Sequence, residues 1–144
     1  ASTLAEFEIP TGMIELEITA AVAASDPEQV VQTLQTLKAS GVTLAIDDFG
    51  TGYSSLAYLQ RFPIDTLKID QAFVRRLGED PEAAAIIELI QGLAHALDLK
   101  VVAEGVETVA QKEFLQAAGC TQLQGHLFSK PLPVAEFTRW LPAL

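Results

Sequence analysis

TLAIDDFGTGYSSLAYL, residues 43–59, combines three features that indicate the fold. An apolar run, Leu44 to Ile46, is typical of a buried strand. Two adjacent carboxylates, Asp47 and Asp48, follow this run, and a loop of small residues over 49–55 comes next. Like charges repel each other at the end of a buried strand, so something must offset that repulsion. The stretch therefore predicts a strand that carries acidic side chains to a functional rim.

Strand-like and helix-like segments alternate on both sides of this stretch. Strands are expected at 13–19, 42–46, 65–70, 100–104 and 122–128. Helices are expected at about 25–41, from residue 80, at 108–119 and at 134–141. A βαβα order predicts an α/β fold with a parallel sheet and helices packed outside it.

Two capping boxes are predicted at helix starts. In each, a hydroxyl residue precedes a Glu or Gln by three positions, a pattern that satisfies free backbone N–H groups reciprocally. The pairs are Ser25 with Glu28 and Thr108 with Gln111.

Composition excludes several classes of protein. The 144 residues suffice for one compact domain, and the hydrophobic share of 49% excludes a disordered segment. A net charge of −10 argues against a nucleic-acid polymer as partner. No apolar run approaches the roughly 18 residues of a membrane span, so we expect no membrane contact by this chain. The single cysteine, Cys120, fits a cytoplasmic location, although a parent protein could be membrane-anchored.

Polar side chains concentrate where the expected strands end. The residues concerned are Glu17, Asp47, Asp48, Lys68, Asp70, Glu104 and Gln124. The C-terminal ends of parallel strands meet in one site, and hard divalent ions relieve the repulsion between buried carboxylates. The pattern predicts two cations about 3.5–4 Å apart, which clamp the attacking and leaving oxygens of a phosphodiester. Lys68 would supply a fixed positive charge.

Taken singly, these features have other interpretations. Two adjacent acids after a strand more often form a helix cap or a turn. Lys68 and Asp70 could form a plain ion pair, and Glu104 and Glu107 a solvated loop. The turn at 50–52 permits close backbone approach to a ligand but matches no nucleotide-binding fingerprint. An enolase-like barrel enzyme, with lysine as a base beside Mg²⁺, is a further hypothesis.

The segments ELEIT, DDFGTGYSSLAYL, DTLKID, VVAEGVET and QGHLFSKPL occur in this order. Together they closely resemble the EAL-type cyclic-di-GMP phosphodiesterases over essentially the whole chain. The resemblance implies a modified (β/α)8 TIM-like barrel with one antiparallel strand. Residues 1–144 would be the C-terminal portion of an EAL domain, about five parallel βα units without the first strands. It also implies a bacterial signalling hydrolase that uses two Mg²⁺ or Mn²⁺ ions to open cyclic di-GMP to the linear dinucleotide.

The resemblance also implies roles for individual residues. Glu17 resembles a ligand of the first metal, Asp47 the bridging ligand, and Asp48 a ligand of the second. Glu104 resembles another ligand of the second metal, and Lys68 the lysine that contacts the catalytic water, which makes Lys68 and Asp48 the catalytic candidates. Supporting or ligand-binding roles are implied for Glu107, Gln124, Gly50, Thr51 and Gly52. The loop at 49–55 resembles one that couples the metal site to a dimer interface, so we expect a homodimer or association with the missing N-terminal part.

Departures from the family pattern affect the expected activity. The naming motif, with its metal-binding Glu, and a strand with a metal-binding Asn are absent, so we expect weak or no turnover from this chain alone. Ala20 stands where the family usually has a Glu that orders the catalytic loop, and His126 replaces a common aromatic residue. A closed barrel needs about eight strands, so five would leave exposed edges. The alternative function is a catalytically degenerate module that binds cyclic di-GMP or a protein partner.

Overall fold

The computed structural model of the protein describes residues 6–50 and 56–141, without the side chains of Ala24 and Leu56. Its strands are β1 (Glu15–Thr19), β2 (Thr43–Phe49), β3 (Thr66–Ile69), β4 (Lys100–Ala103) and β5 (Gln122–Leu123). They form one parallel sheet in the order β1-β2-β3-β4-β5. Each strand lies beside its neighbour in the sequence, with no reversal of order, which is the arrangement of a barrel wall. The predicted parallel α/β fold is confirmed.

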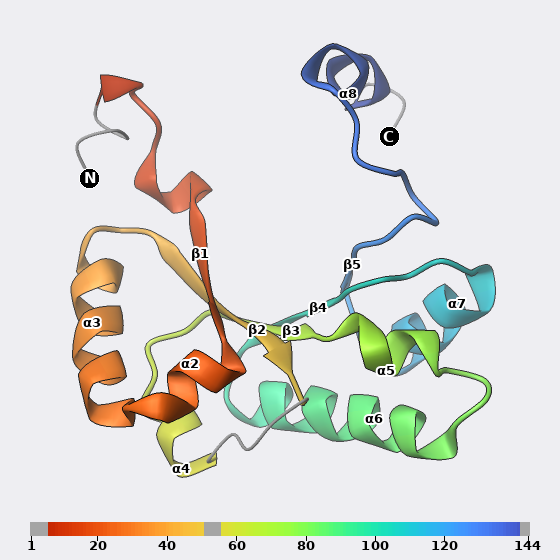
Figure 1. The fold of residues 1–144 in the computed structure, drawn as a ribbon, viewed down its shortest axis with the longest axis horizontal. Helices are drawn as coiled ribbons and strands as arrows, with labels where there is room; N and C mark the ends of the chain where they lie inside the picture. Colours follow the sequence, from red (N-terminus) through yellow and green to blue (C-terminus); the bar gives the residue numbers. More distant parts are fainter. Residues whose placement is uncertain (1–5, 51–55, 142–144) are drawn as a thin grey trace.

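Helices connect the strands and cover one side of the sheet (Figure 1). They are α2 (Ala20–Ser25), α3 (Pro27–Ala39), α4 (Leu56–Leu59), α5 (Gln71–Arg75), α6 (Pro81–Ala96), α7 (Val109–Ala117) and α8 (Val134–Trp140), with a 3-10 turn, η1, at Thr11–Met13. Helix α8 stands apart from the others, and Phe137 in it is 44% exposed. Within the described residues, no helix combines the length and the apolar character that crossing a membrane requires.

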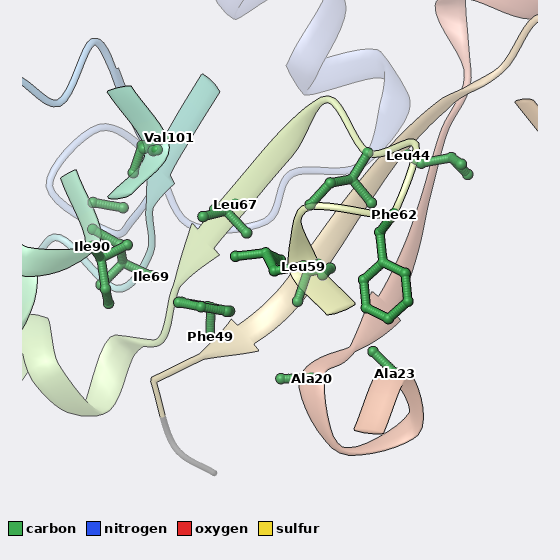
Figure 2. Close-up of a cluster of buried hydrophobic side chains, with 14 of the residues drawn as sticks. Ala20, Ala23, Leu44, Phe49, Leu59, Phe62, Leu67, Ile69, Ile90 and Val101 are labelled. Carbon is green, nitrogen blue, oxygen red and sulfur yellow. The ribbon is translucent and has the colours of Figure 1, made fainter. Parts of the chain in front are cut away.

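The core lies between the sheet and its helices (Figure 2). Alternate residues of the central strands point toward the helices, and Leu44, Leu67 and Ile69 are at most 1% exposed. Ile90 of α6 packs against this face and is 1% exposed. Each such side chain contributes about 1.5–3 kcal/mol through burial, so this layer holds the strand ends in place.

The boundaries differ from the expected ones at several points. Strand β2 continues to Phe49, whereas β5 has only two residues instead of 122–128. The short helices α2, α4 and α5 were not predicted. The carboxylate of Asp70 starts α5 by accepting a hydrogen bond from the Ala72 N–H at 2.6 Å. Because Asp70 turns the chain into this helix, the preceding strand ends at Ile69.

One of the two predicted capping boxes is wrong. Ser25 is the last residue of α2, and its hydroxyl donates to the Val22 carbonyl. The N-cap of α3 is Asp26, whose carboxylate accepts from the Gln29 N–H at 3.3 Å. Asp26 directly precedes a proline at the first helical position, and an aspartate there caps as well as a serine does. The capping box at Thr108 and Gln111 is confirmed.

Candidate functional site

Lys68 lies at the centre of an acidic cluster beside the C-terminal end of β3. It is 6% exposed, and its Nζ donates to Glu17 Oε1 at 2.7 Å. The same nitrogen lies 2.7 Å from Glu104 Oε1 and 3.5 Å from Asp47 Oδ1. Glu17 comes from β1, Asp47 from β2, and Glu104 follows β4 directly. The structure thus brings together predicted site residues from four consecutive strand ends.

The strand register explains how these side chains meet. Glu17 lies opposite Ala45 of β2, and Ala45 lies opposite Thr66 of β3. Ala45 is fully buried and presents only a methyl group, so longer side chains from β1 reach across it to β3. Glu15, which lies opposite Thr43 of β2, also reaches β3, where its Oε2 accepts from the Thr66 hydroxyl at 2.8 Å.

A β-bulge places the two adjacent aspartates. The pairing of β2 with β3 shifts by one residue between Ile46 and Phe49. Asp48 takes up the extra residue with a φ of 55°, a left-handed conformation that aspartate tolerates better than most residues. Its N–H donates to Asp47 Oδ1 at 3.0 Å, and Phe49 returns to the core at 6% exposure. Asp47 and Asp48 therefore share the rim as a bulged strand end, not as a helix cap.

The charges of the cluster are strongly coupled. Burial acts to lower the pKa of Lys68, but its hydrogen bonds to Glu104 and Glu17 and the charge of Asp47 raise it above the ordinary range. Lys68 therefore stays an ammonium at neutral pH while these carboxylates face it. Burial, together with the negative charges of Asp47 and Asp70, raises the pKa of the Asp48 carboxyl.

The carboxylate groups of this cluster are suitable ligands for a hard divalent cation, but in this structure their orientation is set by Lys68. Carboxylate oxygens are the ligands that Mg²⁺ and Mn²⁺ prefer. In residues 6–50 and 56–141, no three or more His, Cys, Asp or Glu side chains are grouped as a metal ion requires. The acids of the cluster face the Lys68 ammonium, which offsets their mutual repulsion. Binding a cation here would require these carboxylates to turn from lysine toward the ion.

A cavity of about 890 Å³ opens beside this cluster. Three predicted residues line it, namely Glu104, Glu107 and Gln124. Sequence reasoning missed its cationic and aromatic walls, which include Arg75, Phe128, Lys130, Phe137 and Trp140. Its volume is in the range of pockets for small organic ligands. The described walls thus combine carboxylates with cationic and aromatic groups.

The loop residues are only partly placed. Gly50 has a φ of 100°, and a Cβ there would lie 2.8 Å from Phe73 Cε2. Its small size is thus required by packing against α5, in addition to any approach to a ligand. Thr51 and Gly52 lie outside the described residues.

The sequence of residues 1–131 matches that of the EAL domain. The chain belongs to the EAL domain family. One relative of this EAL domain is MucR of Pseudomonas aeruginosa, named as a bifunctional diguanylate cyclase and cyclic di-GMP phosphodiesterase. It is 50% identical over 121 residues, which are 84% of this chain and 18% of MucR.

Solved structures show the same architecture as this EAL domain. The PaMucR phosphodiesterase in complex with c-di-GMP superposes with a TM-score of 0.92 at 45% identity, over 94% of this chain and 55% of that one. BlrP1 of Klebsiella pneumoniae, in a manganese and cy-diGMP complex, gives a TM-score of 0.83 at 35% identity, over 90% of this chain and 33% of that one. The five-stranded sheet is therefore part of the TIM-like barrel of EAL domains. The chain spans just over half of the solved PaMucR chain and under a fifth of MucR.

Proposed function

We propose that these residues are the C-terminal portion of a domain that hydrolyses cyclic di-GMP to the linear dinucleotide. The observation that carries the proposal is the contact of Glu17, Asp47 and Glu104 with one ammonium, that of Lys68. Relatives at 42–50% identity support it, since their names give cyclic di-GMP as their substrate.

Four carboxylates would hold the divalent ions. Glu17, Asp47, Asp48 and Glu104 supply oxygen donors on adjacent strand ends, and the BlrP1 complex with manganese supports ions of this kind in the family. When bound, such ions act as Lewis acids on phosphate oxygens and lower the pKa of water.

The remaining chemistry belongs to the side chains of the chain. Lys68 keeps its positive charge, so once Glu17 and Glu104 turn from it toward an ion, its ammonium would be available to attract a water or a phosphate oxygen. Arg75 and Lys130 in the cavity wall complement the negative charge of a phosphodiester. Glu107 and Gln124 offer polar atoms for the hydrogen-bonding edge of a base.

The context of the domain is part of the proposal. Because the chain covers 55% of the PaMucR structure, we propose that further strands of the same protein or a second copy complete the site. We also propose a cytoplasmic location, for which Cys120, buried and free, is the supporting observation.

A comparison of two forms of the protein tests this function. Cyclic di-GMP hydrolysis with Mn²⁺ or Mg²⁺ is measured for the 144-residue chain and for the parent protein that contains it. We expect turnover by the parent and little by the chain alone. Asp47→Asn should lower turnover by a factor of about 10²–10³, whereas Asp98→Asn, on an exposed turn, should not change it. A parent without hydrolysis under these conditions would exclude the phosphodiesterase function.

One observation favours a second candidate, a binding module without turnover. Ala20 begins α2, is 4% exposed and lies in the apolar cluster with Ala23 (Figure 2). A glutamate, usual here in the family, would have to enter this cluster. Titration calorimetry of the parent with cyclic di-GMP, with and without Mg²⁺, tests the candidate. Heat of binding without product would support it, and no heat at high micromolar ligand would exclude it.

A further inference from the structure

Gln111 is a polar side chain buried beside the site, in the first turn of α7. It is 8% exposed, and its amide makes three hydrogen bonds. Its Oε1 accepts from the backbone N–H of Glu107 at 2.8 Å and of Thr108 at 2.9 Å. Its Nε2 donates to the Val74 carbonyl of α5 at 3.1 Å. One side chain thus joins the loop between β4 and α7 to the helix that follows β3.

These contacts exceed what a helix cap needs. In a capping box the side chain at the third helical position needs to accept only from the N-cap N–H, here that of Thr108, while the N-cap side chain accepts from the N–H of that third residue. The bond to Glu107 fixes the peptide of a residue that lines the cavity. The bond to Val74 fastens the same loop to a helix whose first residues follow Lys68 and Asp70.

Backbone hydrogen bonds hold the first part of this loop, so the contribution of the Gln111 side chain is confined to the end of the loop. The Glu104 N–H donates to the Ile69 carbonyl at 3.2 Å, and the Val106 N–H donates to the Gln124 carbonyl at 3.0 Å. Gly105, with a φ of 71°, packs against Gln71, where a Cβ would lie 2.5 Å from the Gln71 Cβ. The start of the loop is therefore fixed by the sheet, and its end, at Glu107 and Thr108, by Gln111.

We propose that Gln111 is a positioning residue that fixes the Glu107 peptide and so sets the direction of the Glu107 side chain along the cavity wall. Its effect on catalysis rests on the function proposed above. Its effect on the loop does not, because it follows from hydrogen bonds within the chain.

Two variants of one capping box separate loop positioning from helix stability. Gln111→Met removes the acceptor for the Glu107 N–H. Thr108→Val removes only the acceptor for the Gln111 N–H, at 3.2 Å, on the helix side. Amide hydrogen exchange is measured for the Glu107 N–H, with Gln116→Met, an exposed glutamine of α7, as the control.

We expect exchange at Glu107 to be about tenfold faster or more in Gln111→Met and unchanged in Thr108→Val and Gln116→Met. Equal exchange at Glu107 in Gln111→Met and in the native chain would overturn the proposal, whatever the activity. Should Gln111→Met not fold, the native chain decides: its Glu107 N–H should exchange slowly, because it donates to Gln111 Oε1 at 2.8 Å, and exchange at the rate of an open amide would overturn the proposal.

Activity provides the second readout. In the parent protein, we expect kcat/KM for cyclic di-GMP to fall about 10–100-fold in Gln111→Met, the size of effect seen when a residue that orients a functional group is lost. Thr108→Val should keep kcat/KM near that of the native protein, even if its melting temperature falls as far as that of Gln111→Met. A parallel loss in both variants would assign Gln111 to helix stability alone. An inactive native protein would instead refute the proposed function and leave the exchange result to decide.

Discussion

The ammonium of Lys68 lies 2.7 Å from the carboxylate of Glu17, although their strands are not neighbours. Strand β2 runs between them, and the β2 residue opposite Glu17 is Ala45, whose side chain is a single methyl group. A contact across an intervening strand depends on that residue being small. A larger residue at Ala45, which itself carries no chemistry, should therefore disturb the site.

Ala45→Leu should separate Glu17 from Lys68. The added carbons overfill a position that is fully buried, and overpacking of this kind costs about 1–3 kcal/mol of unfolding free energy. Any cyclic di-GMP hydrolysis should fall by more than the change in stability explains. Chemical denaturation and turnover are measured together, with Ala45→Ser as the small-residue control. Native turnover in Ala45→Leu would show that the contact across β2 is dispensable.

Lys68→Met should affect stability and metal binding in opposite ways. Without the ammonium, Glu17, Asp47 and Glu104 face each other with no cation, and because these carboxylates are partly exposed to solvent, the loss of their partner costs about 1–3 kcal/mol. The same change removes the competitor for these carboxylates, so Mn²⁺ should bind more tightly while turnover is lost. Calorimetric titration with Mn²⁺ checks this, with Lys100→Met, at an exposed position, as the control. Weaker Mn²⁺ binding would place the metal site elsewhere.

The sequence predicts the strands and the long helices because their signals are local. Apolar runs define β2, β3 and β4, and Asp80 followed by Pro81 starts α6 as expected. The bulge at Asp48 has no such signal, because it arises from the pairing of Phe49 with Ile69 on another strand.

Contacts between side chains were the harder part to predict. Lys68 and Asp70 share a strand face by spacing, which suggested a simple ion pair. Asp70 instead caps α5, and Lys68 turns toward acids on three other elements. The choice between Ser25 and Asp26 as the N-cap of α3 was equally hard, because both residue types are good N-caps. What decides it is that the preceding helix, α2, ends at Ser25, which leaves Asp26 as the cap.

Asp65 should make stability depend on pH at the opposite end of the sheet. Burial acts to raise its pKa, but hydrogen bonds from Lys38 and the Leu44 N–H outweigh it and lower the pKa below the ordinary value of 3.8. A lowered pKa stabilises the folded state above about pH 4, and this contribution is lost as pH falls through the folded pKa. Asp65→Asn should therefore lower the unfolding free energy by about 1–2 kcal/mol at pH 7 and less at pH 3.

Denaturant unfolding at several pH values checks the role of Asp65. Asp98→Asn is the matched control, because Asp98 has a φ of 56°, which asparagine also tolerates. Its stability should follow that of the native chain at every pH. An Asp65→Asn deficit that stayed constant down to pH 3 would mean that the carboxylate charge is not responsible.

Two glycine substitutions should have opposite signs. A Cβ at Gly125 would lie 2.1 Å from the Val106 carbonyl oxygen and 2.3 Å from its nitrogen, a clash with backbone that no side-chain movement relieves. Gly125→Ala should thus push the loop that carries Glu104 and Glu107 away from β5, lowering the unfolding free energy by about 2 kcal/mol or more. Gly92, inside α6, has nothing within 4 Å of its Cβ position, so Gly92→Ala should raise it by up to about 1 kcal/mol. Thermal denaturation of both variants measures these changes in stability. A Gly125→Ala protein as stable as the native one would contradict the close approach of Gly125 to the Val106 backbone.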